Sequence, residues 1–416
     1  MTSPDQDSSS RSSAARVELS IVLPCLNEAK TLAQCIRQAR RGAIDAGAQG
    51  FEIIVADNGS DDGSAEVARA EGAMVVTVGT RGYGAALLGG IQAGRGTYVV
   101  MGDSDASYNL SEIKPFLDVL RQGHPLVIGS RFRGKIHPRA MPFLHRYLGN
   151  PVLTAIANLL FHTRLSDYHC GLRAFHRDTI QSLGLRTTGM EFASEMIIRA
   201  AIAGLDIAEV PVTYSPAGRG RPPHLNTWRD GWRHLRFLLL YSPRWLFLYP
   251  GLTLTALGLV LSVVLLSGPL RIGAVTFDVH TLLFAETCLV LGVQLVLLGV
   301  FARAYASTAG LLPASPRLER LVERFSLGLG LALGVGVGAL GGATYLLGLY
   351  LWSQTGFGPL VDSSLTLRIA ITGTTMILLG AELFFGSFAV SLLGLRQQTP
   401  ALPTGEQAPR GDAMPI

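Results

Sequence analysis

Two carboxylates stand directly after a run of apolar residues in segment 97–105, TYVVMGDSD. The β-branched and apolar residues predict a buried strand, which delivers Asp103 and Asp105 to the carboxyl edge of a sheet. Ligands of open α/β sheets bind at that edge. Carboxylate oxygens suit a hard cation such as Mg²⁺ or Mn²⁺, which in turn suits a diphosphate. A solvated acidic turn is the alternative for an isolated Asp-Ser-Asp, but the buried strand before it favours a metal site.

Polar residues also follow two other predicted strands. Asp57 ends the strand 51–57, where a carboxylate can accept hydrogen bonds from a nucleobase N–H. Asn27 follows the strand 18–23, and capping of the helix 28–41 is sufficient to explain it. These ends are expected at the same edge of the sheet as the acidic pair.

Two glycines precede another predicted helix. Gly82 and Gly84 lie in RGYGAALLGGIQAGRG, after a third strand at 73–78. They could let backbone amides approach a phosphate, although the match to a dinucleotide-binding fingerprint is poor. A tight turn into a helix of small residues, packed closely on the sheet, explains them equally well.

Basic side chains gather after the fifth predicted strand, 125–129. The guanidinium groups of Arg131 and Arg146 have the planar shape that suits a phosphate. Exposed arginines are often only solvated, but the density of positive charge here favours phosphate binding. The basic residues of this stretch include Arg131, Arg133, Lys135, Arg139 and Arg146.

Three further acids have open roles. Asp167 precedes a Cys-Gly turn, which it could brace, and a catalytic role is the alternative. Glu191 and Glu195 are four residues apart on a predicted helix and therefore share a face. Helical acids are usually solvated, but one of these two could approach a substrate.

The composition divides the chain of 416 residues into a soluble and a membrane part. Hydrophobic residues make up 48% and charged residues 16%, and long apolar runs dominate after residue 245. The net charge of +5 comes without an aromatic-interleaved basic patch, so nucleic acid is not an expected partner. The four cysteines show neither metal-ligand spacing nor a disulfide framework, which favours a reducing, cytosolic setting for the soluble part.

Strands and helices alternate through the soluble part, which predicts a doubly wound, mostly parallel sheet. We place this domain at 17–226. Polar tails at 1–16 and 396–416 are expected to be disordered.

Several motifs follow one another in a fixed order within residues 18–245. They are PCLNEA, VADNGSDDGS, RGYGAALLGGI, MGDSDASY, IGSRF, DYHCGLRAF and GMEFASEM. In these motifs the chain resembles the family 2 glycosyltransferases of GT-A fold, and within them the polyprenyl-phosphate and dolichyl-phosphate hexose synthases.

The resemblance implies a role for each matching residue. It implies that Asp103 and Asp105 bind Mg²⁺ or Mn²⁺, that Arg131 and Arg146 hold the phosphate of the acceptor lipid, and that Glu195 is a candidate acid near the donor or acceptor. Asn58 departs from the pattern, because many relatives have an acid there. Residues around the nucleoside of the donor would be Pro24, Leu26, Glu28 and Asp57.

The segment between the two parts is rich in Gly, Pro and Arg. In the resembling synthases it closes near the phosphates, which makes Arg219 and Arg221 candidate contacts, and a plain basic linker is the alternative. Residues 227–245 mix Trp, Arg and Leu as a helix lying in the membrane interface does.

Residues 246–395 are expected to form an α-helical transmembrane domain of four helices. The spans lie near 246–267, 280–302, 327–352 and 369–393, and each is long enough to cross a bilayer. Arginines concentrate between the second and third spans, which puts both termini and the catalytic domain of this multi-pass cell-membrane protein in the cytosol. Glu286 and Glu382 fall within spans, where helix contact or self-association is expected, so a homo-oligomer is possible.

Two functions from different classes follow. The first is inverting transfer of a hexose from a nucleotide sugar, UDP-glucose or GDP-mannose, to a polyprenyl or dolichyl phosphate at the cytosolic membrane face. The second is lipid handling or transport by a membrane protein whose soluble domain only senses nucleotide sugars. The intact pair Asp103 and Asp105, with Arg131 and Arg146, favours the enzyme, because a sensor would not need both sets.

Overall fold

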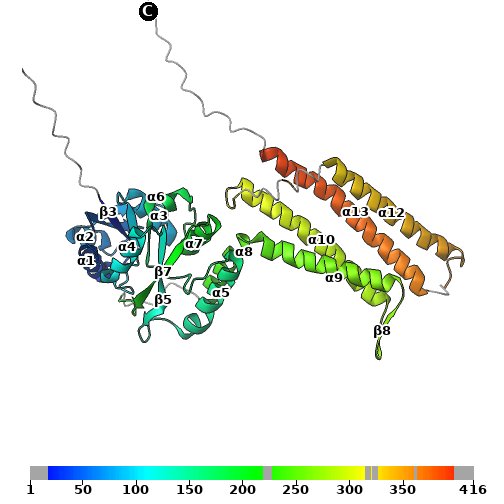
Figure 1. Cartoon of the computed structure of the whole chain (residues 1–416), viewed down its shortest axis with the longest axis horizontal. Coiled ribbons are helices and arrows are strands. Elements are labelled where there is room, and N and C mark those ends of the chain that lie inside the picture. The colour runs from blue at the N-terminus through cyan, green and yellow to red at the C-terminus, as the bar shows by residue number, and fades with distance from the viewer. Residues whose placement is uncertain (1–16, 219–226, 314–319, 321–326, 360–362, 398–416) are drawn as a thin grey trace, which may run out of the picture. The chain divides into compact units, whose positions relative to one another are not determined.

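The chain forms two compact units, Met1–Leu238 and Leu239–Ile416 (Figure 1). The predicted boundaries at 226 and 245 lie on either side of this division. The tail expected at 1–16, and all but the first two residues of the tail expected at 396–416, lie outside the described residues. The computed structural model describes residues 17–218, 227–313, 320, 327–359 and 363–397.

The first unit contains a seven-stranded sheet with the order β3-β2-β1-β4-β6-β5-β7. Strands β1 to β4 are parallel to one another and β7 is parallel to β5, whereas β6 runs antiparallel between β4 and β5. The mostly parallel sheet of the GT-A fold is therefore confirmed, but the sequence did not predict the antiparallel β6. The strands are β1 (Leu19–Cys25), β2 (Phe51–Asp57), β3 (Met74–Thr77), β4 (Tyr98–Met101), β5 (Leu126–Ile136), β6 (Arg173–His176) and β7 (Ile207–Tyr214).

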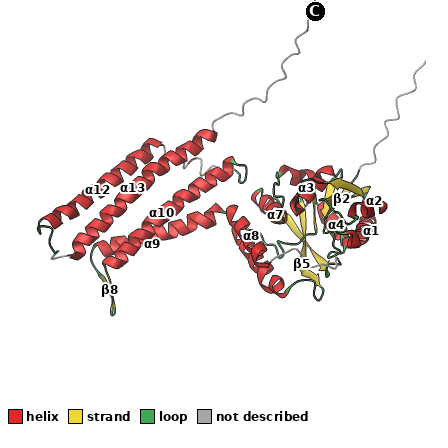
Figure 2. Ribbon diagram, turned by 180° about the vertical axis from the view of Figure 1, so that it is seen from behind, coloured by secondary structure: helices red, strands yellow, loops and turns green. Residues whose placement is uncertain are grey.

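Helices cover both faces of this sheet (Figure 2). Inward residues of α1, α2 and α4 share one buried apolar cluster with alternate residues of the central strands. On the opposite face α3 packs so closely that a Cβ on Gly90 would lie 2.4 Å from a methyl group of Val22. The helices are α1 (Ala29–Asp45), α2 (Ser64–Ala70), α3 (Tyr83–Ala93), η1 (Leu110–Glu112), α4 (Lys114–Arg121), η2 (His145–Gly149), α5 (Asn150–Phe161), α6 (Arg177–Ser182), α7 (Phe192–Ile202) and α8 (Thr227–Leu240).

The register of the sheet brings three strand ends together. Cys25, the last residue of β1, pairs with Asp57, the last residue of β2. Met101, the last residue of β4, pairs with Val22, so the chain beyond β4 runs alongside the end of β1. Residues that follow β1, β2 and β4 therefore meet at one edge, as the sequence predicted.

The second unit has four helices long and apolar enough to cross a membrane, as predicted, among its described residues. A short hairpin joins α9 to α10. These elements are η3 (Arg244–Leu248), α9 (Tyr249–Leu266), β8 (Leu270–Ile272), β9 (Val275–Phe277), α10 (Val279–Thr308), α12 (Leu327–Ser353) and α13 (Ser363–Gln397).

Glycines let the backbones of these helices approach each other. A Cβ on Gly341 of α12 would lie 2.7 Å from the amide nitrogen of Ile377 in α13, and one on Gly380 would lie 2.5 Å from that of Gly338. The pair α9 and α10 does the same, because a Cβ on Gly258 would lie 2.5 Å from the Leu289 nitrogen. The predicted close packing at the glycine run of the third span is confirmed.

Polar contacts link α10 with α13. The Thr372 hydroxyl donates to Glu286 over 3.2 Å, so the helix contact expected for Glu286 is confirmed. The last helix, α13, begins at Ser363, six residues before the predicted span at 369, and therefore includes Arg368. The buried Arg368 pairs with the partly exposed Asp278, which precedes α10. This ion pair explains why a charged residue can be included in the last helix.

Candidate functional site

The acidic loop after β4 is fastened to the end of β1. The strand ends at Met101, and the Gly102 amide donates to the Val22 carbonyl over 3.2 Å. The Ser104 hydroxyl, between the two acids, donates to the Pro24 carbonyl over 2.7 Å. Thr31 of α1 donates in turn to the Ser104 carbonyl over 2.7 Å. Both faces of the loop are therefore held, and the positions of Asp103 and Asp105 are set by β1 and α1.

Each carboxylate of this loop is oriented by a hydrogen bond. The Tyr83 hydroxyl, at the start of α3, donates to Asp103 Oδ1 over 2.9 Å. The Ser107 amide donates to Asp105 Oδ1 over 2.9 Å, and Asp105 is buried. Burial and the negative charge of Asp103 raise the pKa of Tyr83 well above its ordinary value. The phenol therefore stays protonated and remains a donor to Asp103.

Asp103 and Asp105 fit a divalent cation by the chemistry of their donor atoms. Both offer carboxylate oxygens at the carboxyl edge of the sheet, and Mg²⁺ commonly uses one or two carboxylates with substrate phosphates and water. Within the described ranges no group of three or more His, Cys, Asp or Glu side chains could form a cage for a metal ion. The donor set thus suits a cation that is shared with a phosphorylated substrate.

The residues predicted around a nucleoside flank this loop. Asp57 is buried and accepts from the amides of Gly59 and Ser60 at 3.3 Å, and Glu28 is buried at the start of α1. Leu26, in contrast, is 39% exposed beside them. An exposed apolar residue beside two buried carboxylates is compatible with a base-binding edge.

Asn27 does not cap α1, so the capping prediction is wrong. Its backbone has φ of 59°, and its side-chain oxygen accepts from the Asp61 amide over 2.9 Å. The first amide of α1, Ala29, donates instead to Asp62 over 2.9 Å. A residue 33 positions away therefore caps the helix, because the tertiary fold brings the two loops together.

Asn58, the departure from the family pattern, connects β2 to the start of α3. Its amide nitrogen donates to the carbonyls of Val78 and Thr80 over 3.0 and 2.7 Å, and its oxygen accepts from the Gly82 amide over 2.7 Å. An ionised acid could not make the two donations. The asparagine thus holds the loop that precedes Tyr83.

Gly82 and Gly84 are explained by close packing. A Cβ on Gly82 would lie 2.2 Å from the Thr188 carbonyl oxygen, and one on Gly84 would lie 2.3 Å from that of Thr187. Gly82 also has φ of 136°, which other residues rarely adopt. Of the two interpretations that the sequence allowed, the structure supports the tight turn into a packed helix.

Glu195 has a structural position that differs from both sequence interpretations. It is fully buried rather than solvated, and it accepts from the Thr187 amide over 2.8 Å and from the Thr187 hydroxyl over 2.6 Å. It also pairs with Arg199 at 3.0 Å. Its carboxylate therefore holds the segment that packs on Gly82 and Gly84, and we withdraw the assignment of Glu195 to catalysis.

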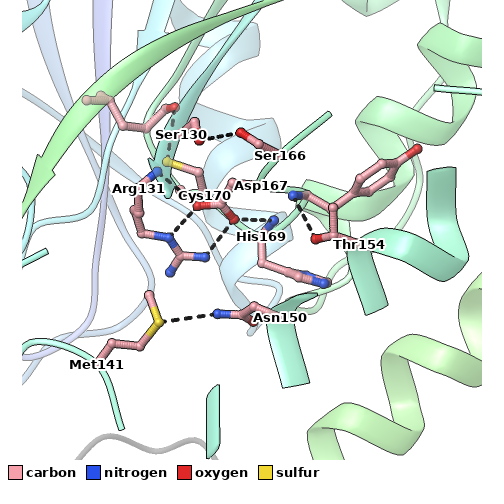
Figure 3. Close-up of polar contacts among 12 residues, drawn as sticks. Ser130, Arg131, Met141, Asn150, Thr154, Ser166, Asp167, His169 and Cys170 are labelled. Atoms are coloured by element: carbon pink, nitrogen blue, oxygen red, sulfur yellow. Dashed lines mark hydrogen bonds and ion pairs between the residues drawn. The ribbon is translucent and has the colours of Figure 1, made fainter. Parts of the chain in front are cut away.

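Arg131 forms a two-pronged ion pair with Asp167 (Figure 3). Its Nε and Nη2 atoms donate to the two carboxylate oxygens over 2.7 and 2.8 Å, and its backbone amide donates over 3.1 Å. Burial alone would raise the pKa of Asp167, but Arg131 outweighs burial and lowers it. Asp167 occupies two of the five N–H donors of this guanidinium, so the predicted contact of Arg131 with a phosphate would use the others and stays a prediction.

The loop that carries Asp167 also contacts the acidic loop. A Cβ on Gly171 would lie 2.7 Å from Asp103 Oδ2, so the glycine leaves room for that carboxylate. The Gly171 amide donates to the Tyr108 hydroxyl over 3.0 Å.

Arg146, on η2, lies with its guanidinium 5.4 Å from the centre of the Tyr147 ring. Its contact with an acceptor stays a prediction.

Comparisons with known proteins agree with this geometry. Residues 20–184 match the model described as Glycosyl transferase family 2, and residues 300–394 match that described as Glycosyltransferase family 2 C-terminal transmembrane region. The chain is 36% identical over 385 residues to the low-salt glycan biosynthesis hexosyltransferase Agl6 of Haloferax volcanii, covering 90% of this chain and 89% of the relative. The chain belongs to the family 2 glycosyltransferases.

Two further proteins are similar to about half of this glycosyltransferase. A dolichyl-phosphate hexose transferase of Haloferax volcanii is 31% identical over 198 residues, covering 47% of this chain and 82% of the relative. The crystal structure of glucosyl-3-phosphoglycerate synthase from Mycobacterium tuberculosis with Mn²⁺, UDP and glucosyl-3-phosphoglycerate is similar at 25% identity and a TM-score of 0.43, covering 54% of this chain and 80% of that chain.

The sequence did not predict the contacts of two residues, Tyr83 and His169. Tyr83 was interpreted only as part of a glycine turn. A tyrosine between two tightly packed glycines can point in few directions, and this could have indicated that its hydroxyl is held in place. His169 was not singled out either. Its Nε2 atom is buried without a hydrogen-bond partner among the described residues, and its ring lies 5.0 Å from that of His234 in α8. Burial, together with His234, lowers the pKa of His169 to about 3.

The remaining predicted contacts, Arg219 and Arg221, lie outside the described residues. The last residue before that segment, Gly218, donates its amide to the Asp105 carbonyl over 2.9 Å. The chain therefore reaches the acidic loop immediately before the predicted basic contacts.

Proposed function

We propose that this glycosyltransferase moves a hexose from a nucleotide sugar to the phosphate of a polyprenyl or dolichyl phosphate, with inversion at the anomeric carbon. The observation that carries the proposal is the acidic loop, in which Asp103 and Asp105 are fixed beside the predicted nucleoside residues Pro24, Glu28 and Asp57. The relative named as a dolichyl-phosphate hexose transferase supports the acceptor class. Family membership disfavours the alternative of a nucleotide-sugar sensor.

The donor's diphosphate would lie at the acidic loop. Asp103 and Asp105 would hold Mg²⁺ or Mn²⁺ there, and the bound cation would neutralise charge on the departing nucleoside diphosphate. Tyr83 keeps Asp103 in one orientation, so this ligand needs little reorganisation. Leu26, Glu28 and Asp57 would contact the base and ribose.

The acceptor phosphate supplies its own nucleophile. A phosphate oxygen attacks the anomeric carbon while the bond from that carbon to the diphosphate oxygen breaks, and no strong general base is needed. Arg146 is our candidate for direct contact with this phosphate. Arg131 would contact the phosphate only through the N–H donors that Asp167 does not use.

The reaction is proposed to take place on the cytosolic side of the membrane. Arginines in the segment between the second and third spans, Arg317, Arg320 and Arg324, outnumber those in the other connections. Positive charge of this kind marks cytosolic segments, which puts the first unit on the same side as that segment.

Full-length protein in detergent, given labelled UDP- and GDP-hexoses with a short-chain polyprenyl phosphate, tests the proposal. We expect one sugar nucleotide to yield a labelled lipid in which the anomeric configuration is opposite to that of the donor. Excess chelator should abolish the product, and Mg²⁺ or Mn²⁺ should restore it. Hydrolysis of every donor without transfer to the lipid phosphate would refute the proposed acceptor. Full transfer in the presence of chelator would refute the proposed metal requirement.

A further inference from the structure

The turn η2 and helix α5 carry a continuous row of apolar side chains on their outer side. Phe143 is 73% exposed and Tyr147 is 60% exposed, and the centres of their rings lie 4.8 Å apart at an interplanar angle of 46°. The other exposed large apolar residues of this row are Leu144, Leu148, Val152 and Leu159. Tyr147 follows Phe143 by four residues, Leu148 and Val152 follow Leu144 at intervals of four, and Leu159 follows Val152 by seven, which puts each set on one side of a helix. We call this row the α5 face.

The polar residues of the same helix point the other way. Thr154 is buried and accepts from the Tyr168 amide over 3.4 Å. Asn158 donates to the Leu165 carbonyl over 2.8 Å and accepts from the Leu165 amide over 3.0 Å. A helix on the surface of a water-soluble domain normally has the opposite polarity. The α5 face is therefore built to contact something apolar.

The stretch of sequence around the α5 face is basic, although Arg121, Arg131 and Arg133 pair with acids from other segments. No Asp or Glu occurs between Asp118 and Asp167. Lys135 and Arg139 are exposed, and Arg146 lies within the α5 face over the ring of Tyr147. The basic residues of this interval, histidines aside, are Arg121, Arg131, Arg133, Lys135, Arg139, Arg146 and Arg164. An apolar row with basic residues is typical of a surface that binds anionic lipid.

Helix α8, the predicted interfacial helix, contacts the same loop of the catalytic unit as the buried side of α5 does. Thr154 of α5 contacts Tyr168, and His234 of α8 contacts the next residue, His169. An ion pair between Arg233 and Glu191 fixes α8 to the start of α7. α8 exposes Trp228 and Trp232. The chain enters the first membrane span at Arg244, four residues after α8 ends, so a bilayer is always within reach of these helices.

We propose that the α5 face inserts into the interfacial layer of the bilayer and is a second membrane contact of the catalytic unit, besides α8. The occupant is the phospholipid surface, because the row combines apolar bulk with the basic residues Lys135, Arg139 and Arg146 on a unit that is tethered to a membrane. Insertion would place Arg146 at the level of lipid phosphates. The inference does not depend on the proposed acceptor, since it needs only the membrane spans.

Site-directed fluorescence in the full chain tests this contact. The native cysteines Cys25, Cys35, Cys170 and Cys288 are all buried. L148C would be labelled with an environment-sensitive fluorophore and reconstituted in nanodiscs of phosphatidylcholine and phosphatidylglycerol that contain doxyl-labelled lipid. We expect quenching from a depth of ~5–10 Å in the headgroup and acyl boundary. E66C on α2, labelled in the same way, should show little quenching.

A substitution pair gives a second readout. Leu148→Glu should reduce the quenching of a label at V152C and lower the transfer rate to acceptor embedded in the bilayer. Ile44→Glu is the matched control, since Ile44 is an equally exposed aliphatic residue on α1. Equal quenching at L148C and E66C would overturn the proposal. So would efficient cross-linking of L148C to itself between two chains without lipid quenching, because the occupant would then be a second copy.

Discussion

The two units of this glycosyltransferase handle buried polar groups in opposite ways. In the catalytic unit the buried acids have dedicated partners, such as Tyr83 for Asp103 and Arg131 for Asp167. In the helical unit, backbones of neighbouring helices come into direct contact, because glycines at positions such as 341 and 380 remove the side chains between helices. A hydroxyl contact such as that of Thr372 with Glu286 is an addition to this packing.

The solvent outside each unit explains the difference. Water drives apolar side chains into the core of the catalytic unit, so stability comes from that core and polar groups can be arranged for chemistry. Lipid is as apolar as the helices it surrounds, so side-chain burial gains little there, and helices associate through close van der Waals contact. The same residue change should therefore have different effects in the two units.

The largest effect is expected on enzymatic activity when an acid of the metal-binding loop is replaced. Asp105→Asn should lower kcat by about 100-fold or more, because one charged ligand to the cation and the diphosphate is lost. Glu286→Gln, the comparison in the helical unit, should keep most activity, since Gln can still accept from Thr372. Initial rates at saturating donor and acceptor measure both. Equal losses in the two variants would contradict this contrast.

Breaking the buried pair should be the largest change in stability. Asp167→Ala leaves the Arg131 guanidinium buried without its partner, which costs about 3–5 kcal/mol of unfolding free energy. Asp206→Ala, at an exposed acid, should change it by less than about 0.5 kcal/mol. Urea unfolding followed by tryptophan fluorescence of the full chain compares the two. A small effect at Asp167 would mean that another group compensates Arg131.

Replacing a glycine of α12 by alanine should destabilise the protein only where a neighbouring helix lies close to that glycine. Gly341→Ala puts a methyl group 2.7 Å from the Ile377 nitrogen, so α12 and α13 must separate, at a cost of about 1–3 kcal/mol. Gly336 has nothing within 4 Å of its Cβ position, so Gly336→Ala should leave stability unchanged or slightly raised. Thermal aggregation in detergent measures the pair. Equal melting temperatures of the two variants would argue against close packing of α12 on α13 at Gly341.

Replacing His169 is expected to have the smallest effect on the free energy of unfolding at neutral pH. Its pKa is lowered to about 3 in the folded protein, against ~6.5 unfolded, so the unfolded state binds more protons between these values. The stability contribution is complete above pH ~6.5 and is lost as pH falls towards 3.

His169→Phe should therefore flatten the acid dependence of unfolding while it keeps the ring beside His234. Urea midpoints between pH 7 and 4 are the measurement. The wild-type slope in the variant would show that Asp167 or other groups, and not His169, set the acid sensitivity.

The sequence by itself determined the broad organisation of this protein. Strands ending in Asp57 and Asp103 predicted the parallel sheet and its acidic edge, because alternation and turn residues are local properties. Four long apolar runs predicted the helices of the second unit for the same reason. The sequence also predicted close packing at the glycine run, of which Gly341 is an example, since small residues at helical spacing permit it.

Only the tertiary structure decided which partner each polar group takes. Asp62 caps α1 from 33 residues away, β6 inserts antiparallel between β4 and β5, and Asp167 occupies the fork of Arg131. Glu195 is buried as a brace instead of lying at a substrate. Partners of this kind are distant along the chain, and a hydrogen bond depends on a separation within about 3 Å that no local pattern encodes. The edge of the sheet was therefore predictable, whereas the contacts that orient its residues were not.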